Sequence, residues 1–554
     1  MAARALGLTA LALSACSLSQ NGVNPPGDTF FYPTSAIMSP TDTAGNWLYV
    51  ANSNADLRFN DGTLVMVNVG MNEFPDATNV DGTLHGAAKD RAGAWPQCPQ
   101  ADYVNPLPRS DAPICCRDLL DPSIINCDER RYVAADGTVA IGSFAAGMVW
   151  QPFCALPDGS YQDPCLPAGT TCLADPAAGR ILIGVRGDTS LTDVDVAPPG
   201  TPDVPAYQNT LPRPAFHCVA DDNQLTPTLA ECNQKIQETG TTLNVLQGDT
   251  STAEVALPDE PYALALDPSE GFLYVGHLAG NTSVQDSGGV SLFNASGVSL
   301  FAKPTFPPPP TFIAPFGSPF PPNSSGLFGV TDLHMHASLG NPTNSNDKRV
   351  YASSRYVPQV SSMTVIGPLL CEPGNSSAIQ DNVLVPAGDN LNPNLVGSEM
   401  RGIEFIDPPD PNSAAQRVFA LQRVPPDLVG FDISSTADGA TTVIPTDVTE
   451  TCSSPTFLYQ YPAPGTATAD NPSRLFINCF DTGEVYVFDP SVPSLITTLM
   501  VGRGPAGMVF DAANAVAYVL NFTQNNLVVV DLAPGSPTQY HVVQRLGFPT
   551  VTPR

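Results

Sequence analysis

The sequence is poor in charged side chains, and the basic ones are the scarcest. Only 14% of its 554 residues are charged, and 23 Lys and Arg stand against 53 Asp and Glu, which gives a formal net charge of −30 at pH 7. Such a surface repels a phosphate backbone, so nucleic acid is excluded as an expected partner. The sequence also lacks the Asp-x-Asp-x-Asp-Gly loop of EF-hand calcium sites. We therefore interpret the acidic residues as a solvated exterior rather than as a cation site.

Several chemical motifs are absent as well. No Cys-x-x-Cys pair occurs, which removes the spacing that a zinc ribbon or covalent c-type haem attachment requires. There is no Gly-x-Ser-x-Gly nucleophile motif and no Gly-rich phosphate loop in a strand–turn–helix setting. The sequence therefore predicts no cofactor and no catalytic nucleophile of these types.

Proline and glycine are plentiful, with 58 and 44 residues, which favours many short strands joined by turns and little helix. Seven short apolar strands recur, each followed about one hairpin later by a partner strand that often ends in Asp or Asn. The first strands lie at residues 48–52, 181–185, 273–277, 350–354, 418–422, 475–479 and 517–521. Their partners lie at residues 64–69, 191–196, 289–294, 363–366, 428–433, 484–489 and 527–531. A hairpin of this kind cannot bury its apolar face alone, so the units are expected to form a stacked or circular array.

A strand that commonly opens with proline precedes most of these hairpins. Its sequences include Tyr-Pro-Thr-Ser-Ala-Ile-Met at residues 32–38, Glu-Pro-Tyr-Ala-Leu-Ala-Leu-Asp at 260–267 and Gly-Pro-Ala-Gly-Met-Val-Phe-Asp at 504–511. Proline is tolerated at a strand start because its missing N–H is not needed there. A further strand before each, such as residues 495–501, brings the prediction to four strands per unit.

These signatures resemble the YVTN-type β-propeller repeat over nearly all of residues 29–549. The resemblance implies an all-β, seven-bladed β-propeller of four-stranded blades, formed as a single domain by residues 29–554. The last apolar strand, at residues 541–549, has no hairpin after it, while the first unit has no strand before residue 32. We therefore expect the C-terminal strand to complete the first blade and to close the ring.

The N-terminus has the features of an export signal. Arg4 precedes a short apolar stretch at residues 5–13, and Leu13-Ser14-Ala15-Cys16 resembles the bacterial lipobox. The resemblance implies a signal peptide at residues 1–15, a lipid on Cys16 and an anchor linker at residues 16–28. Ser17, in place of the Asp that retains lipoproteins in the inner membrane, favours the outer membrane of a bacterial cell envelope. An ordinary secretory signal with an incidental cysteine is the alternative.

Twelve cysteines remain after Cys16, an even number in a chain that carries an export signal. This predicts disulfides rather than free thiols or a metal site. Nine fall between residues 98 and 232, and three lie further along. The candidates are Cys98, Cys115, Cys116, Cys127, Cys154, Cys165, Cys172, Cys218, Cys232, Cys371, Cys452 and Cys479. The pairing stays open, although a bond between Cys218 and Cys232 would close a short loop.

Long inserts separate the predicted units. They are expected at residues 71–136, 150–179 and 197–253, where the disulfides argue for order, and at residues 304–324. The last insert begins with Pro-Thr-Phe-Pro-Pro-Pro-Pro and is interpreted as an extended connector rather than as a docking motif. Long loops on a rigid scaffold are typical places for recognition.

Few polar side chains stand out on the predicted strands. His334 and His336 alternate along one strand, so both point to one face and are candidates for a shared metal. No third ligand follows from the spacing, and two polar residues at the rim of a blade are the alternative. Asp332, Arg401 and Glu404 lie on predicted innermost strands, where side chains reach the central channel. A polar channel suits a small anion or a sugar, although channels are also simply filled with water.

The sequence favours a non-catalytic, monomeric propeller on the envelope that presents loops from residues 71–253 to a protein or glycan. The alternative is an enzyme, because YVTN-like propellers resemble lactonases, streptogramin-lyase-like proteins and quinoprotein dehydrogenases. Those proteins place a metal or cofactor at the mouth of the channel. The chain lacks an evident set of converging His and acidic residues, which favours the binding role.

Overall fold

The computed structural model describes residues 23–40, 47–70, 97–98, 115–155, 161–162, 178–187, 190–197, 214–217, 260–267, 271–278, 289–294, 311–315, 329–337, 348–356, 360–366, 383–387, 391, 398–406, 415–435 and 441–548. Regular structure in these ranges consists of strands, apart from one 3-10 turn, η2 (Glu129–Arg131). No helix in these ranges is long and apolar enough to cross a membrane. The predicted signal peptide and Cys16 lie outside them.

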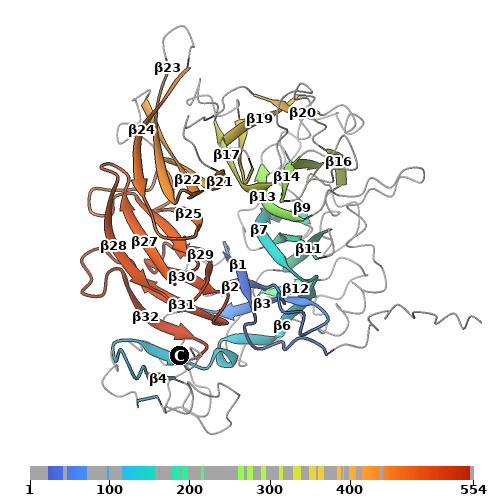
Figure 1. Cartoon of the computed structure of the whole chain (residues 1–554). Helices are drawn as coiled ribbons and strands as arrows, with labels where there is room; N and C mark the ends of the chain where they lie inside the picture. The colour runs from blue at the N-terminus through green and yellow to red at the C-terminus, as the bar shows by residue number, and fades with distance from the viewer. Residues whose placement is uncertain are drawn as a thin grey trace, which may run out of the picture.

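Seven antiparallel blades stand around a central axis, so the predicted seven-bladed β-propeller is confirmed (Figure 1). From the axis outward, blade 1 contains β1 (Pro33–Met38), β2 (Trp47–Asn52), β3 (Gly62–Asn68) and β6 (Val133–Ile141), and blade 2 contains β7 (Ala145–Pro152), β10 (Gly179–Val185), β11 (Ser190–Ala197) and β12 (Ala215–His217). Blade 3 contains β13 (Pro261–Asp267), β14 (Phe272–His277), β15 (Val290–Asn294) and β16 (Thr311–Pro315), and blade 4 contains β17 (Val330–Ala337), β18 (Lys348–Ser354), β19 (Val360–Ile366) and β20 (Val383–Pro386). Blade 5 contains β21 (Ser398–Ile406), β22 (Ala415–Val424), β23 (Asp427–Ser435) and β24 (Thr441–Glu450). Blade 6 contains β25 (Pro455–Tyr461), β26 (Arg474–Cys479), β27 (Glu484–Asp489) and β28 (Ser494–Met500). Blade 7 contains β29 (Pro505–Asp511), β30 (Val516–Asn521), β31 (Asn526–Asp531) and β32 (His541–Leu546).

The seven predicted hairpins are the second and third strands of the blades. The second strands β2, β10, β14 and β30 are buried along their whole length, because each blade packs face to face against two neighbours. A strand that is buried on both faces needs an almost continuous apolar run. The core is therefore divided among the interfaces between blades. Val65 of β3 and Tyr518 of β30, for example, belong to one cluster between blades 1 and 7.

The chain does not close the ring in the predicted way. β32 pairs with β31 as the fourth strand of blade 7, so the prediction that the C-terminal strand completes the first blade is wrong. Blade 1 is completed by β6, which pairs with β3. The outer strand of each blade follows its own hairpin instead of opening the next unit, as β28 does by pairing with β27. The sequence pattern located these strands but assigned each of them to the following blade instead of the preceding one.

Outer strands also occur where the sequence predicted inserts. β6 begins within residues 71–136, β12 lies within residues 197–253, and β16 lies within residues 304–324. The described parts of these segments therefore complete blades 1, 2 and 3. Two very short strands, β8 (Cys154–Ala155) and β9 (Tyr161–Gln162), pair with each other as a separate sheet.

Direct contacts between blades 1 and 7 close the ring. The amide of Tyr32 donates a hydrogen bond to Asn525 Oδ1 at 2.7 Å, and the rings of Tyr32 and Phe522 lie 4.9 Å apart. Tyr518 Oη donates to the carbonyl oxygen of Val69 at 3.4 Å. β1 and β29 lie side by side across this closure (Figure 1).

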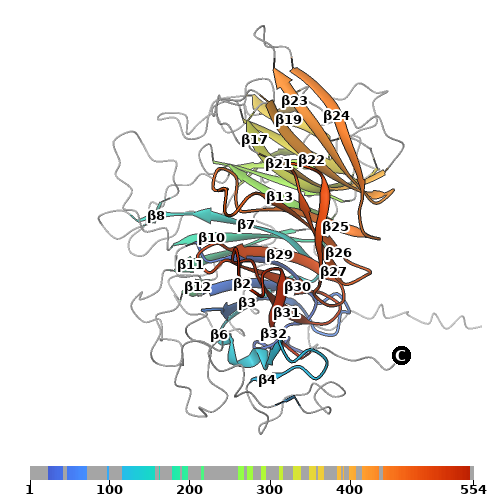
Figure 2. The same cartoon turned by 90° about the vertical axis from the view of Figure 1, so that its left-hand side faces the viewer.

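A hairpin from the N-terminal half covers the free edge of blade 7. β5 (Ile125–Cys127) pairs in parallel with β32, and β4 (Cys115–Arg117) pairs antiparallel with β5, at the bottom of both views (Figures 1 and 2). We call residues 115–127 the clamp hairpin. The bond Cys115–Cys127 links its two strands, and Cys98–Cys116 attaches the segment before it. An exposed sheet edge invites pairing with another chain, and the clamp hairpin covers that edge on blade 7.

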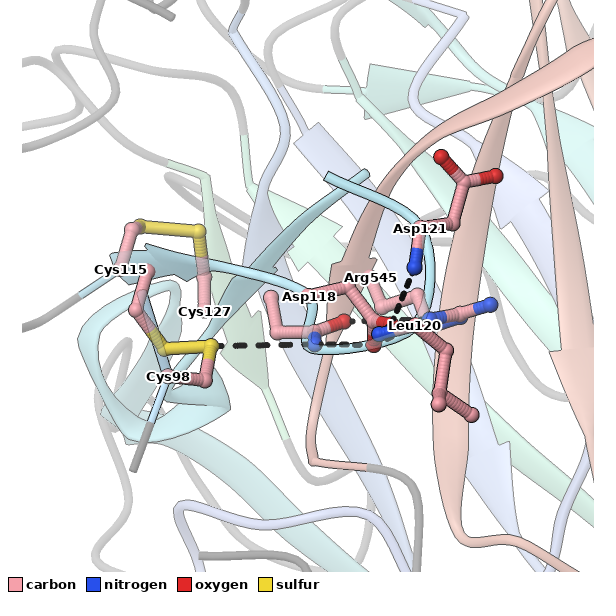
Figure 3. The surroundings of a disulfide bond; sticks show 9 residues. Cys98, Cys115, Asp118, Leu120, Asp121, Cys127 and Arg545 are labelled. Carbon is pink, nitrogen blue, oxygen red and sulfur yellow. Dashed lines mark hydrogen bonds and ion pairs between the residues drawn. A yellow bond between two sulfur atoms is a disulfide. The ribbon is translucent and has the colours of Figure 1, made fainter. Parts of the chain in front are cut away.

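Side chains also hold the clamp hairpin to β32 (Figure 3). The nearly buried Asp118 binds Arg545 Nη1 at 3.0 Å and accepts a hydrogen bond from Asn126 at 2.7 Å. Gln544 Nε2 donates to Cys127 Sγ at 3.2 Å. The clamp hairpin, which follows β3 of blade 1 in the sequence, thus joins blade 1 to blade 7, although neither blade takes one of its four strands from the other.

The predicted disulfides are confirmed for six of the twelve cysteines. Besides the two bonds of the clamp hairpin, Cys452 pairs with Cys479 within blade 6 and ties the loop before β25 to the end of β26. The side chains of the other candidates lie outside the described part of the chain; they are those of Cys154, Cys165, Cys172, Cys218, Cys232 and Cys371.

Candidate functional site

The seven inner strands begin in the same way. Each contains a bulge near its start, and the residue before that bulge has a positive φ. These residues are Tyr32, Phe144, Glu260, Gly329, Glu399, Ser454 and Gly504. All but Glu399 accept, through their carbonyls, a hydrogen bond from a residue that follows the second strand, as in Arg186 N to Phe144 O at 3.2 Å and Arg355 N to Gly329 O at 2.7 Å. The loops before the inner strands and after the second strands therefore share one face of the ring, the leading face.

Four arginines gather on the leading face of blades 2, 4 and 5, and we call Arg186, Arg355, Arg401 and Arg423 the arginine cluster. Arg186 and Arg355 directly follow β10 and β18, Arg401 lies on β21, and Arg423 lies near the end of β22. Arg401 Nη2 donates to Glu399 Oε2 at 2.8 Å. Arg355 Nε is 3.6 Å from Glu399 Oε1, and Arg423 Nη1 is 3.7 Å from Oε2. Three guanidinium groups thus surround one carboxylate.

Tyr262 of β13 lies within charge range of both ends of the cluster. The guanidinium carbon of Arg186 is 5.8 Å from the centre of the Tyr262 ring, and Arg186 also binds Glu260 at 3.1 Å. Burial raises the pKa of Tyr262, and the positive charges of Arg401 and Arg186 oppose this rise. Tyr262 therefore connects the arginines of blades 2 and 5.

Aromatic rings from opposite sides of the ring meet beside the cluster. Tyr262 of blade 3 stacks on Phe457 of blade 6 with ring centres 6.5 Å apart and planes 9° from parallel. Phe457 in turn lies 6.1 Å from Tyr459. All three side chains keep partial exposure. The leading face thus carries flat apolar surface next to guanidinium groups.

Further along the inner strands, polar side chains bind backbone amides of the next blade. Asp332 Oδ2 accepts a hydrogen bond from the amide of Ile403 at 3.2 Å, and Tyr459 Oη accepts one from the amide of Met508 at 3.2 Å. The inner edge of each blade has no fifth strand to pair with. These contacts satisfy some of its free amides and join blade 4 to blade 5 and blade 6 to blade 7.

The two carboxyl groups near the axis hold protons unusually tightly. Burial raises the pKa of Asp332 to about 7, although hydrogen bonds from the amides of Ile403 and Leu333 oppose the rise. Burial and the charge of Asp332 raise the pKa of Glu404 well above its usual value. Glu404 therefore keeps its proton to a higher pH than an ordinary carboxyl group does, and Asp332 is partly protonated at pH 7, which is the state that a general acid requires.

His334 and His336 lie on the side of β17 that faces blade 5. The centre of the Phe405 ring is 5.1 Å from that of His334 and 4.0 Å from that of His336. Burial, and to a smaller extent the charge of His336, lower the pKa of His334 to about 4, so His334 is neutral at pH 7. Among the described residues, no group of three or more His, Cys, Asp or Glu side chains is arranged to hold a metal ion.

The structure places the predicted channel residues on inner strands of neighbouring blades. Asp332 and Glu404 interact near the axis, whereas Arg401 lies at the leading face among arginines that the sequence reasoning missed. Arg186, Arg355 and Arg423 each follow the apolar second strand of their unit closely. An alignment of the repeat units that included the residue after each predicted apolar strand would have identified these arginines.

The comparisons with known proteins find only weak similarities. No family model and no curated protein matches the sequence. The chain is similar to hydrazine synthase from Kuenenia stuttgartiensis, at 11% identity over 91% of this chain and 97% of that one, with a TM-score of 0.39. It is similar to the Cps50 (Swd1) β-propeller domain from Myceliophteria thermophila, at 8% identity over 90% and 96%, with a TM-score of 0.39. It is also similar to the periplasmic gluconolactonase PpgL from Pseudomonas aeruginosa, at 13% identity over 73% and 98%, with a TM-score of 0.36.

Likenesses with TM-scores of 0.36 to 0.39 carry no conclusion about this chain, and one fold supports many unrelated activities. Function must therefore be argued from the side chains of this chain.

Proposed function

We propose that this chain is a non-catalytic binding module whose propeller holds a protein or glycan ligand on the leading face. The arginine cluster carries the proposal: in a chain with 23 basic residues and a net charge of −30, three arginines surround Glu399 on the leading face, and Arg186 lies on the same face beside Tyr262. Positive charge that is concentrated on a rigid, otherwise acidic scaffold favours a ligand with acidic groups. Polar side chains at the centre of a propeller ring are also well placed to bind such a ligand.

A binding screen tests this function. The mature protein is applied to an array of envelope glycans and to native envelope extracts, beside the double variant Arg186→Glu/Arg423→Glu. The matched control is Arg474→Glu, because Arg474 lies at the start of β26 and hence on the opposite face of the ring. Loss of binding in the double variant alone supports the leading face. Binding that survives the double charge reversal places the ligand elsewhere and contradicts the proposal.

We further propose that the module is a lipoprotein of the bacterial cell envelope, attached through Cys16. The lipobox Leu13-Ser14-Ala15-Cys16 supports the lipid, and Ser17 supports the outer membrane. Palmitate labelling of the wild type and of Cys16→Ala tests the anchor. The variant is expected to lose the label and to leave the membrane fraction, whereas retention of Cys16→Ala in membranes contradicts attachment by this lipid alone.

A second candidate, an enzyme, is favoured by one observation. Asp332 lies close enough to Glu404 to raise the proton affinity of Glu404, in the manner of acid–base residues at active sites. Purified protein that hydrolyses a lactone and loses this activity in Glu404→Gln would favour the enzyme. Stoichiometric metal that is lost in His334→Ala/His336→Ala would do the same. Protein that is free of metal and inactive on lactones favours the binding module.

A further inference from the structure

Glu399 indicates which chemical group the arginine cluster holds. Burial raises its pKa, but the hydrogen bond from Arg401 and the charges of Arg401, Arg355 and Arg423 outweigh this effect, and the pKa is lowered. One carboxylate cannot balance three guanidinium groups. Among the described residues, part of the remaining positive charge is met indirectly, because Arg423 reaches Asp481 through the hydroxyl of Ser454. A carboxylate is thus the group that this site stabilises, and its charge is incompletely neutralised.

Arg401 is the buried member of the cluster. Its side chain is 10% exposed, against 41% for Arg355 and 34% for Arg423. Its Nε has no hydrogen-bond partner among the described residues. A buried donor without a partner costs free energy, and a planar guanidinium is best satisfied by two oxygens of one carboxylate. Arg355 and Arg423, which share Glu399 with Arg401, are the more exposed members of the cluster.

The side chain of Glu399 can leave without disturbing the backbone. The amide of Glu399 donates to the carbonyl oxygen of Arg355 at 2.9 Å, which fixes the main chain at this point between blades 4 and 5. The Glu399 side chain itself is 23% exposed and is held only by the arginines. A ligand carboxylate can therefore replace it while the leading face keeps its shape.

Aromatic surface beside the cluster favours a sugar ring over a peptide. The stacked rings of Tyr262 and Phe457 are flat and partly exposed, and Tyr262 is within charge range of Arg401. The apolar C–H faces of a pyranose fit on such rings, while a carboxylate at C6 extends beyond the ring edge toward the arginines. An acidic peptide needs the guanidinium groups but makes no particular use of a flat aromatic pair.

We propose that the arginine cluster binds the carboxylate of a uronic acid in an acidic glycan, and that Glu399 occupies this position until the glycan replaces it. The inference rests on the proposed binding function and names the ligand class of the same site. It also predicts opposite effects for the two kinds of side chain in the cluster. Removing an arginine weakens binding, and removing the Glu399 charge strengthens it.

Calorimetric titration with D-galacturonate and with its neutral methyl ester tests the inference on mature wild type and variants. Arg401→Gln is expected to weaken galacturonate binding about tenfold, because a charge-assisted hydrogen bond to a buried cation is lost. Glu399→Gln is expected to strengthen it about threefold or more, because the competing charge is gone. The methyl ester is expected to bind the wild type at least about tenfold more weakly than galacturonate. Arg474→Gln, on the opposite face, is the control of equal charge change and leaves the affinity unaltered.

Two results overturn the inference and leave the binding function standing: equal affinity for galacturonate and its ester, or weaker binding by Glu399→Gln. A poly-glutamate peptide that binds where galacturonate does not also overturns it, in favour of a protein ligand. If Arg401→Gln fails to fold, Arg355→Gln, whose side chain is 41% exposed, supplies the same comparison. Absence of any ligand in the array and in the envelope extract refutes the proposed function itself.

Discussion

Among single residues, Asp195 in the buried ion pair of blade 2 is predicted to be sensitive to replacement. Arg180 and Asp195 face each other on β10 and β11 with Nε and Oδ1 2.6 Å apart, and both side chains are at most 1% exposed. Asp195→Asn removes the carboxylate that binds this buried guanidinium, which is expected to cost about 3–5 kcal/mol. Denaturant unfolding measures this loss. Arg58→Gln, at a pair in which Arg58 is 67% exposed, is the control and should cost less than about 1 kcal/mol. Similar losses in both variants would contradict the account.

The raised pKa of Asp332 predicts a stability that depends on pH. Its folded pKa is about 7 and its ordinary value is 3.8, so the folded state binds the proton more tightly. The resulting stabilisation is complete below pH 3.8 and is lost as the pH rises through 7. Glu404, whose pKa is raised partly by Asp332, changes in the same direction.

Asp332→Asn removes this titration and keeps an acceptor for the amide of Ile403. The free energy of unfolding of the variant should therefore fall less than that of the wild type between pH 4 and pH 7, in paired denaturant titrations. Parallel curves for the two proteins would show that Asp332 does not titrate in this range.

The sequence located some of the site residues and not others. Asp332, Arg401 and Glu404 were found because their strands have recognisable apolar neighbours and predictable inner positions. Glu399 was missed because nothing in its local sequence shows that it is surrounded by arginines from two blades. Such a contact depends on how blades 4 and 5 pack, which no local pattern contains.

At the level of strands and loops, apolar pattern predicted which residues form strands but not which strands pair. The second strands of the blades are buried on both faces and carry an unmistakable apolar run. Outer strands are more exposed, as β28 shows with one buried residue among its seven, and their sequences fit either neighbouring blade. Because a long stretch of chain separates β3 from β6, the sequence pattern did not identify β6 as the fourth strand of blade 1. The C-terminal strand was therefore predicted in the place of β6.

Close approach of inner strands predicts a specific role for Gly507 of β29. A Cβ atom at this position would lie 2.6 Å from the carbonyl oxygen of Thr34 on β1. Gly507→Ala must therefore push blades 1 and 7 apart and is expected to cost about 1–3 kcal/mol. Thermal unfolding measures the loss. Ser35→Ala, at the corresponding position of β1, removes only a hydroxyl without a partner among the described residues and should leave the melting temperature unchanged. An unchanged melting temperature in Gly507→Ala would contradict the close contact.

The clamp hairpin predicts a local effect of disulfide loss. Replacing Cys115 and Cys127 by alanine should destabilise the fold by about 2–4 kcal/mol, because the unfolded chain is no longer constrained by this bond. Hydrogen exchange should quicken selectively in β32, which loses the support of its partner β5. Replacing Cys452 and Cys479 is the matched control, because that bond lies in blade 6 and should not alter exchange in β32. Equal protection of β32 in both variants would refute the role of the clamp hairpin.

For the whole molecule, composition predicted the charge but not its distribution. The net charge of −30 follows from the sequence, and the ring architecture follows from its repeats. The concentration of four arginines on one face follows from neither, because their positions along the chain span residues 186 to 423. Only closure of the ring brings blades 2, 4 and 5 together around one axis. The binding that we propose is thus a property of the assembled propeller, not of any single blade.

A crystal structure of the mature protein with D-galacturonate tests the central claim most directly. We predict the sugar carboxylate within hydrogen-bonding distance of Arg401 and Arg355, with its ring on Tyr262 and the Glu399 side chain turned outward. Sugar bound at any other position, or Glu399 still bonded to Arg401 in crystals saturated with the sugar, would contradict it.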